Sequence, residues 1–539
     1  MKKVFAIAGG TLLMAGLGVT APSVSSAATS TSPGADPTAA AKEYIQENPN
    51  KVLASALDAF VVKDEITASN GESHVRFTRT YDGLPVLGGD LVVHLTASER
   101  ANGLSITQDK AIKASTTPKV KSDQAADKAR GEFAGDKVSK ANSPKLVIDA
   151  RQGTPVLAWQ TTIKGVQSDG QTPSRQIVVT DANTGKVRSS TESILTPIKV
   201  GTARQGTVKT AKPPQGVAAT GTGKGIFVGT VSLNTSLSGT TYSLLDTTHG
   251  NNRTCDLKNH TSGTCTTFAG TDNSWGTGLQ SNRESAGVDA HYGAAKTFDY
   301  YKTKFGRTGI FNNGTGVPSR VHYGNSYVNA FWDGSQMTYG DGQSNQAPLV
   351  ELDVAGHEMS HGVTENTAGL NYSGDAGGLN EATSDIFGTM VEFYANNASD
   401  TPDFLIGEKI NINGNGTPLR YMDKPSKDGG SYDCWSTSVP NSDPHYSSGV
   451  GNHFFFLLSN GSGQSTYGNS PTCNGSTVAG IGRDKAAAIW YGALTNYMTS
   501  NETYHYARVD TIASATDLYG ATSAEVAAVK AAWSAVSVS

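Results

Sequence analysis

The run His357-Glu358-Met359-Ser360-His361 constrains this 539-residue chain more than any other feature. Residues four apart on an α-helix lie about 40° apart around its axis, so a helix here points both imidazoles the same way. Two such imidazoles suit Zn²⁺, and Glu358 can then act as general base toward a water at the metal. The alternative is a pair of ordinary helix histidines, so the interpretation needs a further ligand.

A second helical stretch supplies that ligand. A catalytic zinc takes three protein ligands, and Glu381 follows His361 by twenty residues in Asn380-Glu381-Ala382-Thr383-Ser384-Asp385. Glu381 and Asp385 share one helix face, so we expect Glu381 to bind zinc and Asp385 to accept the far N–H of His357. The alternative is a solvated acidic face. It is disfavoured because the segment is otherwise largely apolar.

An extended three-histidine zinc motif is absent. Thr364 and Thr367 stand where a Gly and a third His would be needed. The third ligand is therefore expected to be a carboxylate.

The first 28 residues predict a secretory signal peptide. Lys2 and Lys3 precede an apolar run over 4–19, and Ser25-Ser26-Ala27-Ala28 offers small residues for cleavage. A transmembrane anchor is the alternative, but the run is short and no long apolar segment follows. The net charge of −4 disfavours nucleic-acid and anionic-membrane partners. We expect a secreted, extracellular protein that is a monomer.

The four cysteines, Cys255, Cys265, Cys434 and Cys473, have no zinc-knuckle spacing. Export favours disulfides, and four cysteines permit three pairings. Nearness in sequence favours Cys255 with Cys265 and Cys434 with Cys473.

Composition divides the chain into segments. Residues 28–42 resemble a flexible leader. Residues at about 50–110 and 145–190 have strand patterning, and residues 117–140 predict an exposed helix between them. Residues 201–218, rich in Gly, Pro, Lys and Thr, predict a linker with a processing site near Ala218 or Ala219. A β-rich part over 219–370 and an α-rich part over 371–539 follow. Expected helices lie at about 288–301, 351–364, 381–394, 483–498 and 523–536.

Further motifs make residues 219–539 resemble the thermolysin family of secreted neutral zinc metalloproteases. Besides the two zinc segments, they are Val288-Asp289-Ala290-His291-Tyr292, Asn329-Ala330-Phe331-Trp332, Leu419-Arg420-Tyr421-Met422, His445-Tyr446-Ser447-Ser448-Gly449 and Ala515-Thr516-Asp517-Leu518-Tyr519-Gly520. Residues 45–195 resemble that family's propeptide, which implies two small α+β modules at about 45–110 and 118–195. The resemblance implies an α+β fold: an α+β propeptide over 29–200, then a two-lobed catalytic domain with the zinc helix between a β-rich and an α-helical lobe.

The resemblance also implies roles for single residues. One zinc would bind His357, His361 and Glu381, and Glu358 would activate the zinc-bound water and pass its proton to the leaving amine. Tyr372 and His445 would stabilise the oxyanion, and Asp443 would orient His445. The implied substrate-binding residues are Asn329, Ala330 and Trp332 along the substrate backbone, Arg420 at its carbonyl, and Val354 and Leu419 in an apolar pocket. Cleavage before bulky hydrophobic residues is therefore expected.

Calcium is implied by the same resemblance. At least one structural Ca²⁺ would be bound by Asp353, Glu392, Asp403 and Glu408, although each could be an ordinary surface acid. Leu405 stands where some members place a further carboxylate, so one ion is expected rather than two. Pro348-Leu349-Val350-Glu351 replaces a Gly-Gly pair found in some members, so the hinge motion attributed to those glycines is not expected here.

The sequence thus predicts an inhibited precursor of an endopeptidase that acts on proteins and peptides, with its own propeptide as inhibitor and folding aid. A non-enzymatic zinc-binding module is the first alternative, and the complete set Glu358, Tyr372 and His445 weighs against it. A serine esterase is the second. Gly-x-Ser-x-Gly is absent at the two nearest segments, Gly461–Ser465 and Gly334-Ser335.

Overall fold

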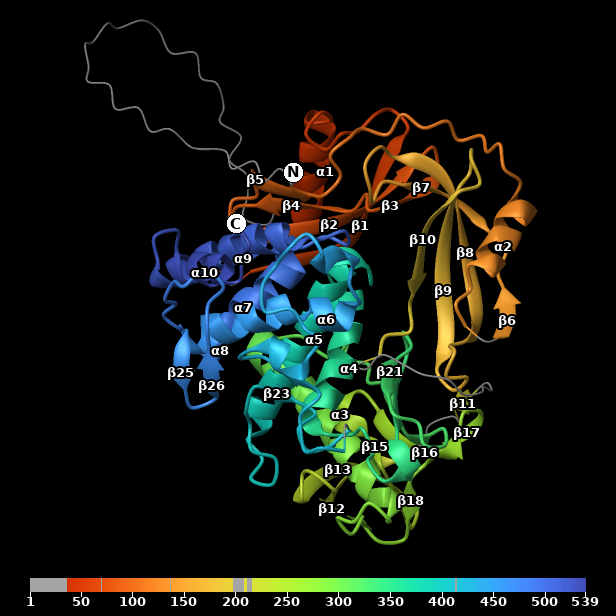
Figure 1. The fold of residues 1–539 in the computed structure, drawn as a ribbon, viewed down its shortest axis with the longest axis vertical. Coiled ribbons are helices and arrows are strands. Elements are labelled where there is room, and N and C mark those ends of the chain that lie inside the picture. The colour runs from red at the N-terminus through yellow and green to blue at the C-terminus, as the bar shows by residue number, and fades with distance from the viewer. Residues whose placement is uncertain (1–35, 69, 136, 197–207, 211–215, 413) are drawn as a thin grey trace, which may run out of the picture. The chain divides into compact units, whose positions relative to one another are not determined.

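The computed structural model describes residues 36–539 except 69, 136, 197–207, 211–215 and 413 (Figure 1). The predicted signal peptide and most of the predicted linker lie outside these residues. The chain divides into two compact units. The first comprises the described residues up to Thr116 together with Ile148–Val156, and the second comprises Thr117–Val147 and Leu157–Ser539.

The first unit packs a helix against an antiparallel sheet. Helix α1 (Pro37–Glu47) is capped at its N-terminus by Asp36, whose side chain accepts from the Thr38 N–H. Residues 37–42 are therefore helical, and their interpretation as a flexible leader is wrong. The strands are β1 (Asp58–Thr67), β2 (Ser73–Tyr81), β3 (Leu84–Leu87), β4 (Leu91–Leu95) and β5 (Ala101–Ile106). Strand β2 pairs with β1, β3 and β4, and the end of β7 (Lys145–Asp149) joins β3.

The second unit begins with a small α+β module. Its elements are α2 (Ser122–Gly131), β6 (Lys137–Ala141), β8 (Val156–Val166), β9 (Pro173–Asp181) and β10 (Val187–Glu192). Strands β10, β9 and β8 are neighbours in that order, and β6 pairs with β8. Helix α2 is shorter than the helix expected over 117–140. It ends at Gly131, because the alternating segment after it pairs as an edge strand.

Two sheets follow. The first has the order β11 (Val208–Thr210), β17 (Gly263–Thr267), β16 (Asn252–His260), β20 (Pro318–Tyr323), β22 (Met337–Gly340) and β21 (Ala330–Trp332), with β15 (Leu245–Asp246) beside β16. The second has the order β18 (Ala269–Gly270), β14 (Thr241–Ser243), β13 (Thr230–Ser238), β12 (Val217–Lys224) and β19 (Ser274–Trp275). Ala218 and Ala219, the predicted processing region, lie in β12 and pair with Ser236 and Thr235. Strand β21 forms one edge of the first sheet, so its outer side is open to a further strand.

Helices fill the rest of the unit. They are α3 (Arg283–Phe305), α4 (Leu352–Glu365), α5 (Gly374–Ala395), α6 (Pro444–Ser447), α7 (Gly449–Asn460), α8 (Arg483–Gly492), α9 (Tyr504–Tyr519) and α10 (Ala524–Ala535), with a π-helical turn at Ala493–Tyr497. Short hairpins pair β23 (Leu405–Ile406) with β24 (Arg420–Tyr421) and β25 (Gly463–Ser465) with β26 (Gly468–Ser470). Helix α5 starts seven residues before the predicted start at 381, because its polar and glycine-rich first two turns carry no apolar period.

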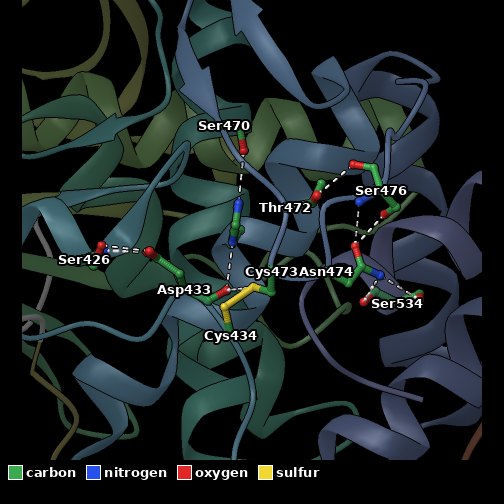
Figure 2. Close-up of a disulfide and its surroundings, with 10 residues drawn as sticks. Ser426, Asp433, Cys434, Ser470, Thr472, Cys473, Asn474, Ser476 and Ser534 are labelled. Atoms are coloured by element: carbon green, nitrogen blue, oxygen red, sulfur yellow. Dashed lines mark hydrogen bonds between the residues drawn. A yellow bond between two sulfur atoms is a disulfide. The ribbon is translucent and has the colours of Figure 1, made fainter.

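Both disulfides predicted from nearness are present. Cys255 bonds Cys265 across the β16–β17 hairpin, and Cys434 bonds Cys473. Figure 2 shows the second bond near Asn474, whose side chain donates to Ser534 O (3.0 Å). The Cys473 N–H donates to Ala535 O (2.7 Å). The bond therefore ties the 434 loop to the end of α10.

Candidate active site

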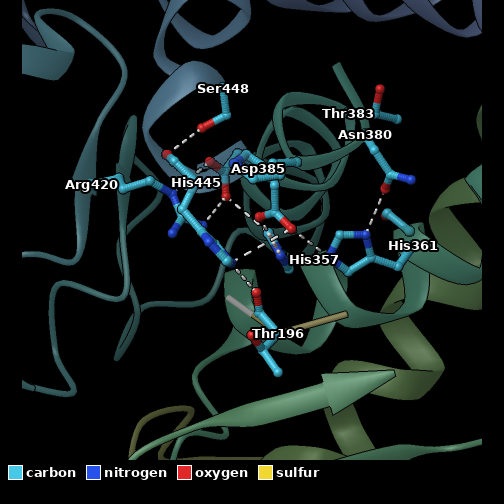
Figure 3. A network of polar contacts seen from close by, with 12 residues as sticks. Thr196, His357, His361, Asn380, Thr383, Asp385, Arg420, His445 and Ser448 are labelled. Atoms are coloured by element: carbon cyan, nitrogen blue, oxygen red, sulfur yellow. Dashed lines mark hydrogen bonds and ion pairs between the residues drawn. The ribbon is translucent and has the colours of Figure 1, made fainter. Parts of the chain in front are cut away.

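Helices α4 and α5 bring the three predicted zinc ligands together. His357 Nδ1 bonds Asp385 Oδ1 (2.8 Å), and His361 Nδ1 bonds Asn380 Oδ1 (2.8 Å), as Figure 3 shows. The carboxylate oxygen of Asp385 and the amide oxygen of Asn380 both accept, so each Nδ1 carries the proton and each Nε2 keeps a lone pair. The two Nε2 atoms therefore face Glu381 as ligands rather than donors.

The separations of these atoms fit a tetrahedral ion. His357 Nε2 lies 3.5 Å from Glu381 Oε2, and His361 Nε2 lies 3.3 Å from Glu381 Oε1. Bonds of about 2.0–2.1 Å at tetrahedral angles place two ligand atoms about 3.3–3.4 Å apart. Within the described residues, both Nε2 atoms and Glu381 Oε2 are buried without a hydrogen-bond partner. Unpaired buried polar atoms are costly, so this geometry suits a bound Zn²⁺.

Asp385 accepts hydrogen bonds from several residues of the site. Besides His357 it accepts hydrogen bonds from Arg420 Nε (2.8 Å) and Nη2 (2.6 Å) and from Asn452 Nδ2 (2.8 Å). Burial alone would raise the pKa of Asp385, but the Arg420 charge and the His357 hydrogen bond outweigh it and hold that pKa far below its usual value. Asp385 is therefore an anion that fixes both the imidazole and the guanidinium.

Glu358 lies next to the proposed zinc ligands on α4. Its side chain is fully buried, and neither carboxylate oxygen has a hydrogen-bond partner among the described residues. Burial and the nearby Glu381 charge raise its pKa well above the usual value. A carboxylate held in this way readily accepts a proton.

Tyr372 and His445 converge on the same point from other elements. The Tyr372 hydroxyl donates to Glu381 Oε1 and lies 3.3 Å from His445 Nε2. His445 Nδ1 donates to Asp443 Oδ1 (2.6 Å), as the sequence predicted. Burial would lower the pKa of His445, but Glu381 and Asp443 outweigh it and raise that pKa. Two donors thus face the metal position from one side.

The edge strand β21 carries Ala330 and Trp332, with Asn329 just before it. Its free side is occupied by the segment after β10: Leu195 N–H donates to Trp332 O (3.3 Å), and Trp332 N–H donates to Leu195 O (3.1 Å). The next carbonyl, that of Thr196, accepts from His445 Nε2 (Figure 3). A peptide of the chain itself therefore pairs with the edge strand and reaches the candidate catalytic histidine.

The apolar pocket residues flank one glycine. A Cβ added at Gly407 would lie 3.4 Å from Leu419 Cβ and 3.9 Å from Val354 Cγ2. Val354 is buried on α4, and Leu419 is half-buried directly before Arg420. Both side chains thus approach the same backbone position.

The predicted calcium ligands belong to a larger acidic cluster. Carboxylate oxygens of Glu408, Glu351 and Asp400 lie within 4.8 Å of one another. Burial, then the charges of Asp353 and Glu408, raise the pKa of Glu392 well above its usual value. Asp403 adds to the same field, and Asp400 pairs with Lys409 Nζ (2.7 Å). So many buried carboxylates repel one another unless cations neutralise them.

Several site residues have no role in the sequence-based interpretation. Asn380 is part of the second zinc segment, and its side chain orients His361. Glu365, the last residue of α4, accepts from the Trp332 indole N–H (2.8 Å). Glu351 and Asp400 join the acidic cluster. A count of acids within ten residues of the predicted ligands would have indicated these two, whereas nothing local indicates Glu365 or the Thr196 contact.

Known proteins resemble this chain over most of its length. Residues 220–365 match the thermolysin metallopeptidase catalytic domain, residues 368–538 its alpha-helical domain, and residues 58–103 the fungalysin/thermolysin propeptide motif. Bacillolysin of Bacillus cereus is 39% identical, over 90% of this chain and 86% of that protein. Thermolysin of Bacillus sp. (strain EA1) is 36% identical, over 87% and 84%.

Two further relatives differ in coverage. The transglutaminase-activating metalloprotease of Streptomyces mobaraensis is 49% identical over 90% of this chain, which spans only 61% of that protein's length. The structure of a protealysin precursor from Serratia proteamaculans is 28% identical, covers 53% of this chain and 87% of its own, and has a TM-score of 0.40.

Proposed function

Because the chain belongs to the thermolysin family of metalloendopeptidases, which carry a propeptide, we propose that it is a secreted endopeptidase whose zinc is held by His357, His361 and Glu381. The observation that supports this most is the convergence of two imidazole nitrogens and one carboxylate at tetrahedral separations of 3.5 and 3.3 Å. Within the described residues, every helix is too short or too polar to serve as a bilayer span. We further propose an extracellular monomer that acts on proteins and peptides.

The proposed reaction divides its work among the residues around the metal. Zinc bound here would acidify a water and polarise the substrate carbonyl. Glu358 takes the proton of the attacking water and passes it to the leaving amine, which its unpaired buried carboxylate suits. Tyr372 and His445 donate to the oxygen on which negative charge develops. Asp443 keeps the His445 ring turned toward that oxygen.

Substrate would bind as an added strand on β21. The backbone groups of Ala330 and Trp332 and the Asn329 side chain would hold it, and Arg420 would bind the carbonyl just past the cleaved bond. Val354 and Leu419 would receive the side chain that follows that bond. This pocket supports a preference for cleavage before bulky hydrophobic residues.

The propeptide would inhibit the precursor by occupying the edge of β21 on which a substrate would bind. Its segment pairs with Trp332 through two backbone hydrogen bonds, and its Thr196 carbonyl accepts from His445. A substrate cannot add to the same edge while that pairing persists. Cleavage in the 201–218 region would then start the release of the propeptide, and its role as a folding aid belongs to the same proposal.

A structural calcium would be bound by the acidic cluster of Asp353, Glu392, Asp403 and Glu408, extended by Glu351 and Asp400. Oxygen ligands of this kind suit Ca²⁺, and Glu408 Oε2 has no hydrogen-bond partner among the described residues. At least one ion is proposed.

The test replaces the proposed base. Glu358→Gln keeps the shape of the side chain and removes its basicity, so casein hydrolysis should fall by about 10²–10⁴-fold while zinc content stays at one per chain. Glu525→Gln, which alters a surface glutamate paired with Lys485, is the control and should retain activity. Full activity of Glu358→Gln would refute the assigned base, and a zinc-free wild type with full activity would refute the metal site.

A further inference from the structure

Beyond the sites described above, the structure contains an aromatic cluster beside the free edge of the sheet. We propose that Tyr323, Tyr327 and Phe331, with the Cys255–Cys265 disulfide, form a subsite of the mature enzyme for an aliphatic substrate side chain. That side chain belongs to the residue two positions before the one whose carbonyl is attacked. The inference rests on the proposed endopeptidase function and adds a specificity determinant to it.

The register of the bound segment defines this position. Thr196 presents its carbonyl to His445 Nε2, so Thr196 stands where the acyl residue of a substrate would stand. Leu195 forms both backbone hydrogen bonds with Trp332. The residue before it, Ile194, is therefore two positions before the acyl residue, and a substrate strand on the same edge would follow this order.

Ile194 is buried in the aromatic cluster. It is only 6% exposed and belongs to one apolar cluster with Leu257, the disulfide and the three rings. The ring of Tyr323 lies edge-on to the rings of Tyr327 (5.0 Å between centroids) and Phe331 (5.3 Å). Such edge-to-face pairs are favourable beyond the area that they bury, so the three rings stabilise one another.

The polar ends of the same rings bind a different part of the propeptide. The Tyr323 hydroxyl donates to Gln171 O (2.5 Å), and the Tyr327 hydroxyl lies 2.7 Å from Thr172 Oγ1. The hydroxyls therefore face the tip of the β8–β9 hairpin, and the apolar faces remain for Ile194. When the propeptide leaves, these faces become accessible next to Trp332.

Hydrogen bonds within the propeptide also fix the conformation of the bound segment. Glu192 Oε1 accepts from the N–H groups of Arg175 (2.8 Å), Ser193 (2.9 Å) and Ile194 (2.9 Å). This cage presents Ile194 in a fixed direction. Because Ile194 fits the cluster, we infer the kind of side chain that the cluster accepts. That side chain is compact, aliphatic and uncharged.

The test uses the processed enzyme and a series of quenched fluorescent peptides. The peptides share one sequence with Leu after the cleaved bond and differ only at the third residue before that bond, which is Ile, Ala or Asp. We expect kcat/KM to be about tenfold lower for Ala than for Ile, and lower again for Asp, because a hydrophobic pocket discriminates by roughly this factor. Tyr327→Ser should bring the Ile and Ala rates together, whereas Tyr327→Phe, which keeps the ring, should preserve the difference.

Each other outcome contradicts the subsite. Equal rates for Ile, Ala and Asp, with chelator-sensitive cleavage retained, would overturn the subsite and leave the endopeptidase function standing. Failure of the wild type to cleave any peptide would overturn both.

A second measurement covers the case in which Tyr327→Ser does not fold. In full-length precursor, Ile194→Ser should weaken retention of the propeptide on the processed enzyme in gel filtration by about tenfold. Val138→Ser, at a propeptide residue that is 42% exposed, should not. Equal retention in the two variants would overturn the proposal.

Discussion

Gly356 and Gly388 face each other where helix α4 crosses helix α5. A Cβ built on Gly356 would lie 2.9 Å from Gly388 Cα, and one built on Gly388 would lie 2.4 Å from Asp353 O. Neither position has room for a methyl group, so the helices approach as closely as backbones allow. His357 follows Gly356 directly, and Glu381 lies two turns before Gly388, so this crossing sets the spacing of the zinc ligands.

Gly356→Ala and Gly388→Ala should therefore weaken zinc binding. Each methyl group would push α5 away from α4, with a loss of about 1–3 kcal/mol in the free energy of unfolding from overpacking. Zinc titration followed by thermal unfolding measures both effects. Gly131→Ala is the control, because a Cβ there meets nothing within 4 Å. Unchanged zinc affinity in both variants would mean that the crossing does not set the ligand spacing.

Asp385→Asn should lower zinc affinity by about 10–100-fold, the usual effect of losing a partner that orients a ligand. The change removes the anion that holds His357 and leaves Arg420 buried with a neutral partner. Asp443→Asn is the matched control, since Asp443 accepts a hydrogen bond from His445, which is not a proposed zinc ligand. It should retain zinc and lower kcat instead. Equal zinc affinity in the two variants would contradict this division of roles.

Stability should decrease in mildly alkaline solution because of His249. Burial alone would lower its pKa, but hydrogen bonds to Asp246 (2.5 Å) and Asp299 (2.9 Å) outweigh it and raise the pKa from 6.5 to about 9. A raised pKa in the folded state means that the stabilisation is complete below about pH 6.5 and is lost as pH rises through about 9. Thermal unfolding between these values, in a Glu358→Gln background that stops self-digestion, should show the loss, and His249→Gln should remove it. A parallel decline in both proteins would assign the pH dependence to other groups.

Calcium removal should lower the unfolding temperature. An ion that binds only the folded chain stabilises it by about 2.7 kcal/mol at one hundred times its Kd. Glu408→Gln removes one carboxylate of the cluster and should make the unfolding temperature insensitive to calcium. Asp272→Asn, which changes an exposed acid outside the cluster, should not. Calcium dependence that survives in Glu408→Gln would place the ion elsewhere.

The sequence predicted the metal centre better than its surroundings. The four-residue spacings in α4 and α5 follow from helix geometry alone, so His357, His361, Glu381 and Asp385 could be placed before the structure. The early start of α5 could not be predicted, because residues 374–378 have weak helix propensity and are packed against other segments of the same chain. The glycines of this stretch are tolerated because they lie close to other residues: a Cβ on Gly378 would meet Ser447 Oγ at 2.7 Å.

Contacts distant in sequence were the least predictable. The hydrogen bond from Trp332 to Glu365 and the approach of Thr196 to His445 join residues 33 and 249 positions apart. No periodic pattern encodes such pairs, since they depend on how the sheets and helices pack. Leu195 and Thr196 were expected only as the end of the second propeptide module and the residue after it, and no local pattern indicates their pairing with β21.

The pairing of Leu195 with Trp332 links two properties that would otherwise vary separately. In the proposed function, one strip of backbone would bind the propeptide before maturation and the substrate after it, so a mutation that strengthens this pairing would also delay activation. Selection for tighter substrate binding by this strip would therefore also favour precursors that the propeptide inhibits more strongly. Variants that combine rapid maturation with high substrate affinity must therefore gain that affinity from substrate contacts outside this strip.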